Sequence, residues 1–375
     1  MSDRVLGDLA ELTVGHVGPM ASEYVAHGIP FLRSLNVQPF RVDLSGVKFI
    51  SPEFHAKLRK STLRPGDVVV VRTGAPGTAA VVPDSLPLAN CSDLVIVRPG
   101  PELDSRYLAY LINGVARGYI DSRTVGAVQQ HFNVGAARGV PIPAASMEEQ
   151  QRIASVLGAL DDLIETNRLL GTSLANQITA LFRGLETTHE QPFFDVFDVD
   201  FGAAFKGYHF GAPGVGLPLL RIRDLKTFRS DIWTTERIDG DVLIAPGDVV
   251  VGMDAEFRPT RWLGAPSLLN QRVCRVRAKR RSLAWAREAL VGPLAYVEGH
   301  KAGTTVAHLN KRDIEELRIH VPDPEAGARF DCQAQPLYDA VVSLQYEVAD
   351  LTRVRDELLP LLMSGNILVA DVVAA

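Results

Sequence analysis

The sequence predicts a mixed α/β fold of the α+β kind, in which two tandem β-rich domains are separated by two long antiparallel helices that form a coiled coil. Three observations lead to this prediction. The chain repeats itself once, each repeat begins with short β-branched runs punctuated by glycine and proline, and each repeat ends in a long heptad pattern. A chain of 375 residues also exceeds the size of most single hydrophobic cores, which favours two domains.

The internal repeat consists of four pairs of similar segments that occur in the same order in the two halves of the chain. One of these pairs, Pro-Gly-Asp-Val-Val-Val, is identical. The partners lie about 180 residues apart, too far for a solenoid. The pairs are residues 28–33 with 216–221, 65–70 with 246–251, 126–133 with 303–310, and 181–184 with 362–365. Four collinear matches indicate two homologous domains.

Each half begins with segments typical of short β-strands. In the first half, residues 67–71 and 93–97 are β-branched runs bounded by Gly, Pro and Asn. Residues 72–77, Arg-Thr-Gly-Ala-Pro-Gly, have the composition of a turn that connects two strands. A proline-rich hinge follows at 141–143, and its counterpart in the second half lies at 322–324.

A long helix is expected after each hinge. In the first, Ser146 with Glu149 three residues later forms a capping-box pattern at the expected start. In the second, Gly365 is a plausible stop signal. The resulting parts of the chain are a first domain at 1–145, a central helix at 146–185, a second domain at 186–325, a C-terminal helix at 326–367 and a tail at 368–375.

Both helical segments carry apolar residues on alternating four- and three-residue steps, the spacing of a coiled coil. The expected coiled-coil residues are Ile153, Leu157, Leu160, Ile164, Leu337, Val341, Leu344, Leu351 and Leu358. Arg355 interrupts the second series, and Asp161, Asp162 and Glu165 are expected on the wet, solvent-exposed face of the first helix. The same spacing also occurs in helices that pack on their own domain. The length of about four heptads and the presence of two copies favour the coiled coil.

Several segments resemble, in family order, the specificity subunits of Type I restriction–modification systems. Residues 149–157 and 160–165 resemble the central conserved helix of that family, and residues 351–367 its C-terminal conserved helix. Similarity to the opening of a target-recognition domain of that family is found at residues 205–207, 216–218 and 221–225. Similarity to the closing segment of such a domain is found at 303–306 and 308–311. The first half departs from this pattern after Asn133, where Val-Gly-Ala replaces Lys-Arg-Asp.

The resemblance implies a DNA-sequence-reading subunit without a catalytic centre. It implies two target-recognition domains that each read half of a bipartite site in double-stranded DNA, and helices that set the spacing between the half-sites. It also implies assembly with two modification (methyltransferase) subunits, and with restriction subunits in the full complex. The formal net charge of −5 argues mildly against nucleic acid, although locally basic surface can still bind phosphates.

The candidate DNA-contacting residues are basic side chains for phosphates and polar side chains for base edges. Six basic residues occur in ten positions between Arg272 and Arg281, which predicts phosphate contacts, although a solvated charged strand is equally plausible. Arg72 and Arg258 lie in corresponding turns of the two halves. The full candidate set is Arg33, Arg72, Thr73, Gln129, Gln130, His131, Arg221, Arg223, Arg258, Arg272, Arg275, Arg277, Thr304, Thr305, His308, Asn310 and Lys311.

The sequence carries no pattern typical of an enzyme centre. Residues 74–78 lack the lysine and spacing of a phosphate-binding P-loop. The three cysteines are far apart, so neither a metal site nor a disulfide framework is expected. We therefore expect no catalytic residues, no metal, no cofactor and no membrane partner, in a cytoplasmic protein. Two alternatives remain open: a coiled-coil scaffold that does not bind DNA, and a stand-alone DNA-acting enzyme with an unrecognised site.

Overall fold

The structure is a computed structural model that describes residues 4–123, 131–301 and 308–373. These residues form two compact units. The first unit consists of residues 1–163 and 351–375, and the second of residues 164–350. Each unit thus combines a β-rich head with part of both long helices.

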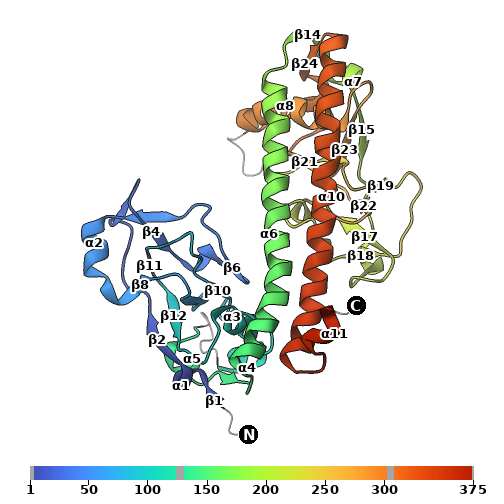
Figure 1. The fold of residues 1–375 in the computed structure, drawn as a ribbon. Coiled ribbons are helices and arrows are strands. Elements are labelled where there is room, and N and C mark those ends of the chain that lie inside the picture. Colours follow the sequence, from blue (N-terminus) through green and yellow to red (C-terminus); the bar gives the residue numbers. More distant parts are fainter. Residues whose placement is uncertain (1–3, 124–130, 302–307, 374–375) are drawn as a thin grey trace. The chain divides into compact units, whose positions relative to one another are not determined.

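The two heads share three corresponding sheets, and the first head has the small β5-β6 sheet in addition (Figure 1). Each head has a four-stranded sheet, with strand order β10-β9-β12-β2 in the first and β21-β20-β23-β15 in the second. Each also has a five-stranded sheet, with orders β3-β7-β4-β11-β8 and β16-β18-β17-β22-β19, and a two-stranded pair, β1-β13 or β14-β24. This correspondence of strand order in three sheets confirms the internal duplication.

The strands of the first head are short. They are β1 (Arg4–Val5), β2 (Ala10–Val14), β3 (Tyr24–Val25), β4 (Ile29–Leu32), β5 (Val37–Gln38), β6 (Arg41–Val42), β7 (Lys48–Ile50), β8 (Thr62–Leu63), β9 (Val68–Val71), β10 (Ala79–Val81), β11 (Ala89–Cys91), β12 (Leu94–Pro99) and β13 (Pro141–Ile142). The helices of this head are α1 (Leu6–Leu9), α2 (Pro52–Lys57), α3 (Ser105–Asn113), α4 (Arg117–Arg123) and α5 (Val134–Arg138).

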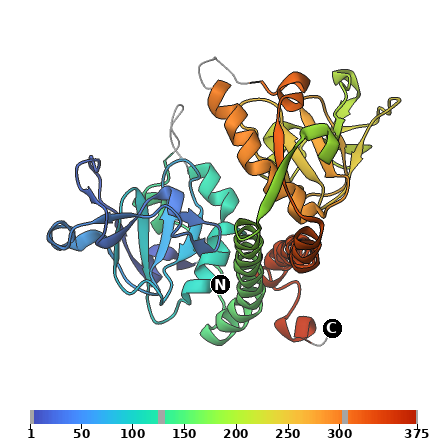
Figure 2. The same cartoon turned by 90° about the horizontal axis from the view of Figure 1, so that it is seen from above.

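The second head repeats most of this series, without a counterpart of α2 or of the β5-β6 pair among its described residues. Its strands are β14 (Thr187–Pro192), β15 (Phe197–Phe201), β16 (Phe210–Gly211), β17 (Leu217–Leu220), β18 (Trp233–Thr234), β19 (Leu243–Ile244), β20 (Val249–Gly252), β21 (Pro259–Arg261), β22 (Ser267–Leu269), β23 (Val273–Ala278) and β24 (Arg318–Pro322). Its helices are α7 (Phe193–Val196), α8 (Leu283–Lys301) and α9 (Lys311–Glu315). Helix α8 covers the four-stranded sheet (Figure 2).

The identical segment of the repeat forms the central strand of each four-stranded sheet. In the first head, Val68 and Val70 face the core beneath α3, while Val69 and Val71 face the core shared with the five-stranded sheet. All four side chains are almost completely buried. A strand that is buried on both faces needs an uninterrupted apolar run rather than an alternating one, which explains the Val-Val-Val sequence.

The first segment of the repeat is explained by a close approach of two backbones. A Cβ at Gly28 would lie 2.3 Å from the Ile50 carbonyl oxygen, and one at Gly216 would lie 2.1 Å from the Thr234 carbonyl oxygen. In addition, φ is +155° at Gly28 and +85° at Gly216. Glycine is therefore required just before β4 and β17, where each strand turns onto its antiparallel neighbour.

Two long helices follow the heads, as expected. Helix α6 spans Met147–Arg183 and helix α10 spans Pro324–Met363. The Ser146 hydroxyl accepts a hydrogen bond from the Glu149 N–H at 3.2 Å, as an N-cap does. Helix α10 begins two residues before the predicted 326, because Pro324 suits the first helical position and the Asp323 carboxylate accepts from the next N–H groups. Gly365, with φ of +73°, follows its end.

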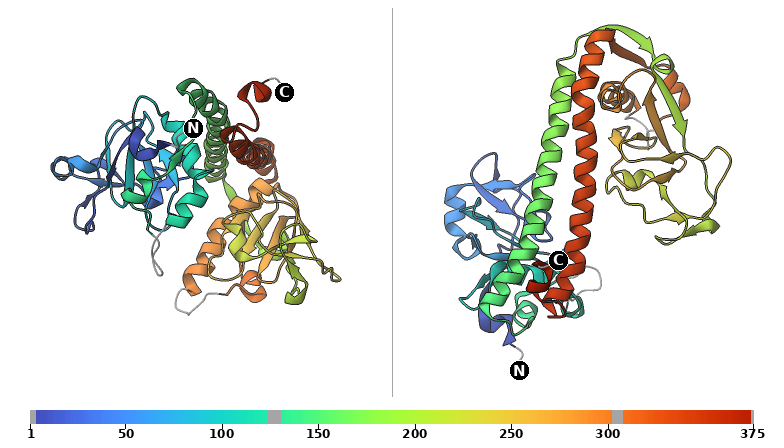
Figure 3. Two further views of the ribbon diagram at one scale, coloured as in Figure 1. Left: turned by 90° about the horizontal axis from the view of Figure 1, so that it is seen from below. Right: turned by 45° about the vertical axis from the view of Figure 1, so that its right-hand side comes forward.

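Helices α6 and α10 are antiparallel in both units (Figure 3). In the first unit Asp161 contacts Arg355. In the second unit the Asn167 side-chain amide donates to Glu347 at 3.0 Å, and the rings of Phe182 and Phe330 contact each other. As residue numbers rise along α6 they fall along α10. The expected coiled coil of two antiparallel helices is therefore confirmed.

The nine expected coiled-coil residues are all buried or half-buried. Ile153, Leu157, Ile164 and Val341 are buried, while Leu160, Leu337, Leu344, Leu351 and Leu358 are half-buried. Part of this stripe also packs on the heads. Ile153 and Leu157 belong to the core of the first head, and Leu358 and Leu337 pack against the cores of the first and second heads. Both interpretations of the heptad spacing thus apply, each to part of the helices.

Arg355 does not interrupt the helix pair but forms a polar contact within it. Its guanidinium lies 2.7 Å from the Asp161 carboxylate and 4.4 Å from the centroid of the Phe40 ring. The Tyr110 hydroxyl donates to the same carboxylate. The side chains of Arg355 and Asp161 are 11% and 19% exposed, so the expectation that Asp161 lies on the wet face was wrong. That expectation did not take account of Arg355, which faces Asp161 from α10.

These observations confirm the predicted fold class, with two tandem β-rich heads and a pair of long antiparallel helices. In the described part of the chain, no helix combines the length and the apolar character that crossing a bilayer requires.

Replacing Gly216 by Ala should destabilise the protein strongly, because the added Cβ meets the Thr234 carbonyl and the backbone has a positive φ. We expect a loss of about 3 kcal/mol or more, in the range of the larger single-residue effects. Gly214→Ala is the matched control: its φ is +98° and nothing lies within 4 Å of the added Cβ. It should cost about 1 kcal/mol. Urea unfolding measures both, and equal losses would contradict the close-approach explanation.

Replacing Arg355 by Leu should cost about 3 kcal/mol of unfolding free energy, because it leaves a largely buried carboxylate without its cation. The double variant Asp161→Leu/Arg355→Leu should recover most of this loss, since both charges are then gone. Arg353→Leu removes an exposed pair with Glu357 on the same helix and should change stability by no more than about 0.5 kcal/mol. A double variant as unstable as Arg355→Leu alone would argue against the pairing.

Candidate nucleic-acid interface

In each head, the end of the central strand meets the segment that carries the histidine of the repeat. In the first head the Phe132 N–H donates to the Arg72 carbonyl at 3.0 Å, directly after β9. In the second head the Leu309 N–H donates to the Met253 carbonyl at 2.7 Å, directly after β20. Phe132 and Leu309 are both 1% exposed, so a buried side chain and a backbone hydrogen bond position the preceding histidine in both heads.

The two histidines contact equivalent residues of the strand-end loop. His131 Nδ1 lies 3.1 Å from the Thr73 hydroxyl. His308 Nδ1 lies 2.6 Å from a carboxylate oxygen of Asp254, and their backbones form an isolated antiparallel bridge. Thr73 and Asp254 are each two residues beyond the last strand residue of β9 and β20. The same site of the fold therefore carries a hydroxyl in one head and a carboxylate in the other.

An arginine–aspartate pair accompanies each histidine, with the charges placed differently. Arg72 Nη1 lies 3.6 Å from Asp93 in the first head, and Arg272 Nη1 lies 3.8 Å from Asp254 in the second. Asp93 and Arg272 occupy the same place, just before β12 and β23, and both have positive φ, at +54° and +71°. We call Arg72, Thr73, Asp93 and His131 the first loop cluster, and Asp254, Arg272 and His308 the second loop cluster.

The sequence identified Arg72, Thr73, His131, Arg272 and His308, and the structure brings them together within their two heads. Asp93 and Asp254 were not among the candidate residues predicted from the sequence. The repeat could have indicated Asp254, because the offset between the identical segments 65–70 and 246–251 aligns it with Thr73.

Arg258 is not the counterpart of Arg72. Strand register places Met253 at the position of Arg72, while Arg258 lies at the other end of the same loop, just before β21. Its side chain is 77% exposed and lies 3.7 Å from Glu256. A pocket of about 470 Å³ lies beside it, lined by Phe257, Arg287 and Glu298 among others.

The basic run from Arg272 to Arg281 does not form one exposed patch, because carboxylates from neighbouring elements enclose two of its arginines. Arg275 is 16% exposed and lies 2.8 Å from Asp200 and 3.2 Å from Asp248. Arg281 is 14% exposed and pairs with Asp331 on α10. These two arginines are structural. Asp200, on β15, is a partner of Arg275.

The exposed members of this run remain candidates for phosphate contacts. Arg277 is 49% exposed with Asp200 at 3.2 Å, and Lys279 is 39% exposed with Asp198 at 3.7 Å. Arg280 is exposed.

Arg33 and Arg221, which end the repeated segments 28–33 and 216–221, belong to tight turns. The Arg221 N–H and guanidinium both donate to Asp224, whose side chain is 2% exposed. The Arg33 N–H donates to Asn36, and its guanidinium donates to the Gly46 carbonyl. Arg223 is exposed.

The closing segment begins a short helix in both heads. Asn310 is the N-cap of α9, where its side chain accepts from the Asp313 N–H at 3.0 Å. Asn133 does the same for α5 with the Ala136 N–H at 2.9 Å. The cap is thus kept although Val-Gly-Ala replaces Lys-Arg-Asp. Lys311 is 70% exposed. Four further candidates, Gln129, Gln130, Thr304 and Thr305, lie outside the described residues.

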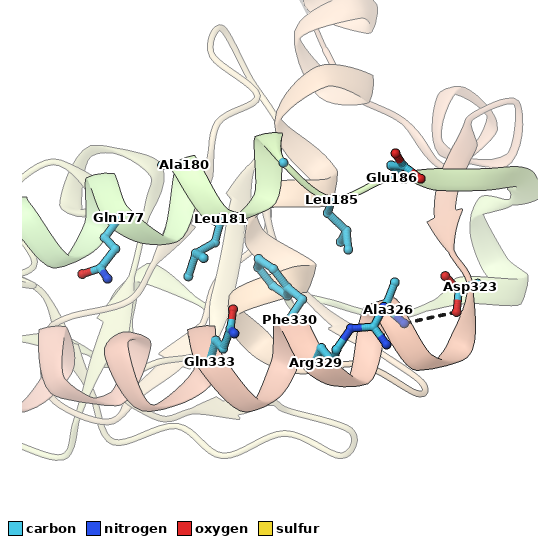
Figure 4. A pocket seen from close by; sticks show the side chains of 11 residues that line it. Gln177, Ala180, Leu181, Leu185, Glu186, Asp323, Ala326, Arg329, Phe330 and Gln333 are labelled. Carbon is cyan, nitrogen blue, oxygen red and sulfur yellow. Dashed lines mark hydrogen bonds between the residues drawn. The ribbon is translucent and has the colours of Figure 1, made fainter.

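A second pocket lies between the end of α6 and the start of α10 in the second unit. It has a volume of about 650 Å³. In Figure 4 the side chains of Leu181, Leu185 and Phe330 gather between the two helices, with Asp323 and Arg329 beside them. Its lining combines these apolar side chains with polar and charged ones. Within the described ranges, no group of three or more His, Cys, Asp or Glu side chains is arranged to hold a metal ion.

Comparison with known proteins points to one group of relatives. A segment of 123 residues is 32% identical to the Type I restriction enzyme EcoBI specificity subunit of Escherichia coli, covering 32% of this chain and 26% of that protein. The Type I restriction enzyme MjaIX specificity subunit of Methanocaldococcus jannaschii is 21% identical over 349 residues, which cover 82% of this chain and 79% of that protein. The chain thus matches about a quarter of the E. coli relative's length. No family model matches the chain.

The fold has a counterpart among solved structures. The crystal structure of the S subunit of a Type-I restriction-modification system from M. genitalium superposes with a TM-score of 0.61 at 15% identity, over 96% of this chain and 95% of that one. In sequence and in fold, the chain therefore resembles the specificity subunits of Type I restriction–modification systems.

Proposed function

We propose that this chain is the sequence-specific DNA-binding subunit of a Type I restriction–modification system, in which each head reads one half of a bipartite target in double-stranded DNA. One observation carries the proposal: the two heads share one fold but carry different side chains at the same strand-end loop, Thr73 in one and Asp254 in the other. Two copies of one binding unit suit a target read twice. Different side chains at the reading position suit two different half-sites.

Exposed basic side chains supply the part of the affinity that does not depend on sequence. Arg277, Lys279 and Arg280 lie on or next to β23 with substantial exposure. Contacts of this kind bind phosphates and release counterions, and they anchor a protein without reading bases. Arg221 and Arg275 are not part of this proposal, because their guanidinium groups are engaged with buried or half-buried carboxylates.

The helix pair sets the distance between the half-sites and docks partner subunits. On α6, Leu163, Leu169 and Leu170 are 50%, 62% and 46% exposed, so this helix offers apolar side chains that a partner can cover. We propose that two methyltransferase subunits bind these helices, with restriction subunits joining in the full complex. The chain itself contributes recognition, and the cofactor and the catalysis belong to those partners.

Neutralising the exposed basic residues should weaken binding to every DNA sequence alike. For the variant Arg277→Gln/Lys279→Gln/Arg280→Gln, we expect the slope of log affinity against log salt to become shallower by up to about 2.7, or about 0.9 for each phosphate contact. Arg152→Gln/Arg329→Gln/Arg353→Gln removes the same charge from surface ion pairs of the long helices and should leave the slope unchanged.

Replacing Arg258 by Gln should instead change the preferred bases. Gel-shift titration of the assembled complex measures all three, and a uniform effect of Arg258→Gln on all sequences would contradict its role.

Mapping of methylated bases in cells with and without this gene tests the function itself. We expect a split motif that disappears with the gene. Purified chain that cuts DNA without partners would support the enzyme instead, and a complex that lacks DNA affinity would support the scaffold.

Lengthening both helices by one heptad should lengthen the spacer of this motif. Duplicating residues 157–163 in α6 and 344–350 in α10 adds seven residues, about 10 Å, to each helix. This corresponds to about three base pairs at roughly 3.4 Å each. Methylation mapping reads the new spacer directly. Duplication in α6 alone is the control, because it shifts the register of the pair and should abolish the motif. An unchanged spacer in the double insertion would overturn the spacing role.

A further inference from the structure

The histidine of the closing segment is the member of its motif whose side chain has no structural task. In both heads the next residue, Phe132 or Leu309, is the buried anchor. The residue after that, Asn133 or Asn310, is the cap of a short helix. His308 is 55% exposed, and its side chain contacts Asp254. Packing and capping therefore explain two of the three repeated residues and leave the histidine unexplained.

The partner of each histidine determines how its ring hydrogen-bonds. A carboxylate can only accept, so the proton of a neutral His308 lies on Nδ1, 2.6 Å from Asp254. Its Nε2 is then an acceptor, because the state of one ring nitrogen sets that of the other. A hydroxyl both donates and accepts, so Thr73 at 3.1 Å allows either arrangement of His131. The two heads therefore present histidines of different hydrogen-bonding character at the same place.

The surrounding charges support this arrangement. Arg272 lies 3.8 Å from the same Asp254 oxygen that His308 contacts. A lone carboxylate at a DNA surface would be repelled by phosphates, and the arginine offsets this charge. In the first head, where the histidine partner is neutral, the carboxylate and the arginine are Asp93 and Arg72, paired with each other at 3.6 Å. Each cluster therefore has one carboxylate and one arginine. Of the two clusters, it is the second in which this carboxylate also contacts the histidine ring.

We propose that His131 and His308 each contact one base pair of their half-site, and that the residue at position 73 or 254 sets the base that is preferred. Asp254 holds His308 with Nε2 as an acceptor, which selects an exocyclic amino group in the major groove: N6 of adenine or N4 of cytosine. Thr73 leaves His131 free to accept or donate, so it discriminates less between bases. This proposal rests on the proposed function and adds the residues that determine specificity.

Exchanging the two partner residues tests the proposal. The complex of the chain with its modification subunits selects duplexes from a random library, and sequencing of the bound fraction gives the preference at each position. Thr73→Asp should raise the preference for an amino-bearing base at one position of the first half-site by about tenfold, which lies at the lower end of what one specific base contact contributes. Asp254→Thr should reduce it by a similar factor at one position of the second half-site. All other positions should stay as in the unaltered protein.

The histidines themselves give a second measurement. His308→Ala should remove discrimination at the position that Asp254→Thr affects, and His131→Ala should act in the first half-site. His320→Ala is the matched control, since His320 is an exposed histidine of the same unit that lies 3.1 Å from a carboxylate, Glu190. It should leave the motif unchanged. If Asp254→Thr fails to fold, Asp254→Asn replaces it, because an amide both donates and accepts and so releases the ring in the same way.

Failure of the inference and failure of the function give different results. If the unaltered complex selects no split motif, the proposed function is wrong, and this inference falls with it. If the motif is present and the exchanges at 73 and 254 leave every position unchanged, the inference is overturned while the function stands. Variants that weaken all sequences equally would also overturn it, because they would show a phosphate contact or a structural role.

Discussion

Both heads depend on a central strand that is buried on both of its faces. Because β9 and β20 have apolar neighbours above and below, their position and register are determined by packing and by the ladder hydrogen bonds on either side. The loop that leaves each strand therefore starts from a rigid point. Side chains that must be placed accurately against a ligand are best held by such elements, and both loop clusters begin two residues or fewer beyond the buried strand.

The helix pair combines apolar packing with a few polar contacts in defined places. Arg355 with Asp161 in the first unit and Asn167 with Glu347 in the second are buried or half-buried pairs between α6 and α10. Polar pairs in a helix seam add little net stability but disfavour shifted registers, in which they would lose their partners. For a protein whose proposed task is to hold two reading heads at one spacing, a unique register matters more than a few kcal/mol.

The pattern of apolar residues predicted more of this structure than the pattern of charged residues did. The repeat, the valine-rich strands, both helices and their antiparallel pairing followed from spacing that is local in the sequence. The basic run at 272–281 suggested one uniform patch, but Asp200 and Asp248 enclose Arg275 while other members of the run stay exposed. Arg355 was taken as an interruption, because its partner lies on another helix.

The sequence by itself determined which segments form strands and helices and that the fold occurs twice, since backbone preference and apolar periodicity act between near neighbours. The tertiary structure alone decided the partner of each charged or polar side chain. Asp254 and His308 are 54 residues apart in the chain yet lie in hydrogen-bond contact. Such a contact depends on distance in space and on which groups can donate or accept. That information arises only when the strand end and the closing segment have been brought together by burial of the core.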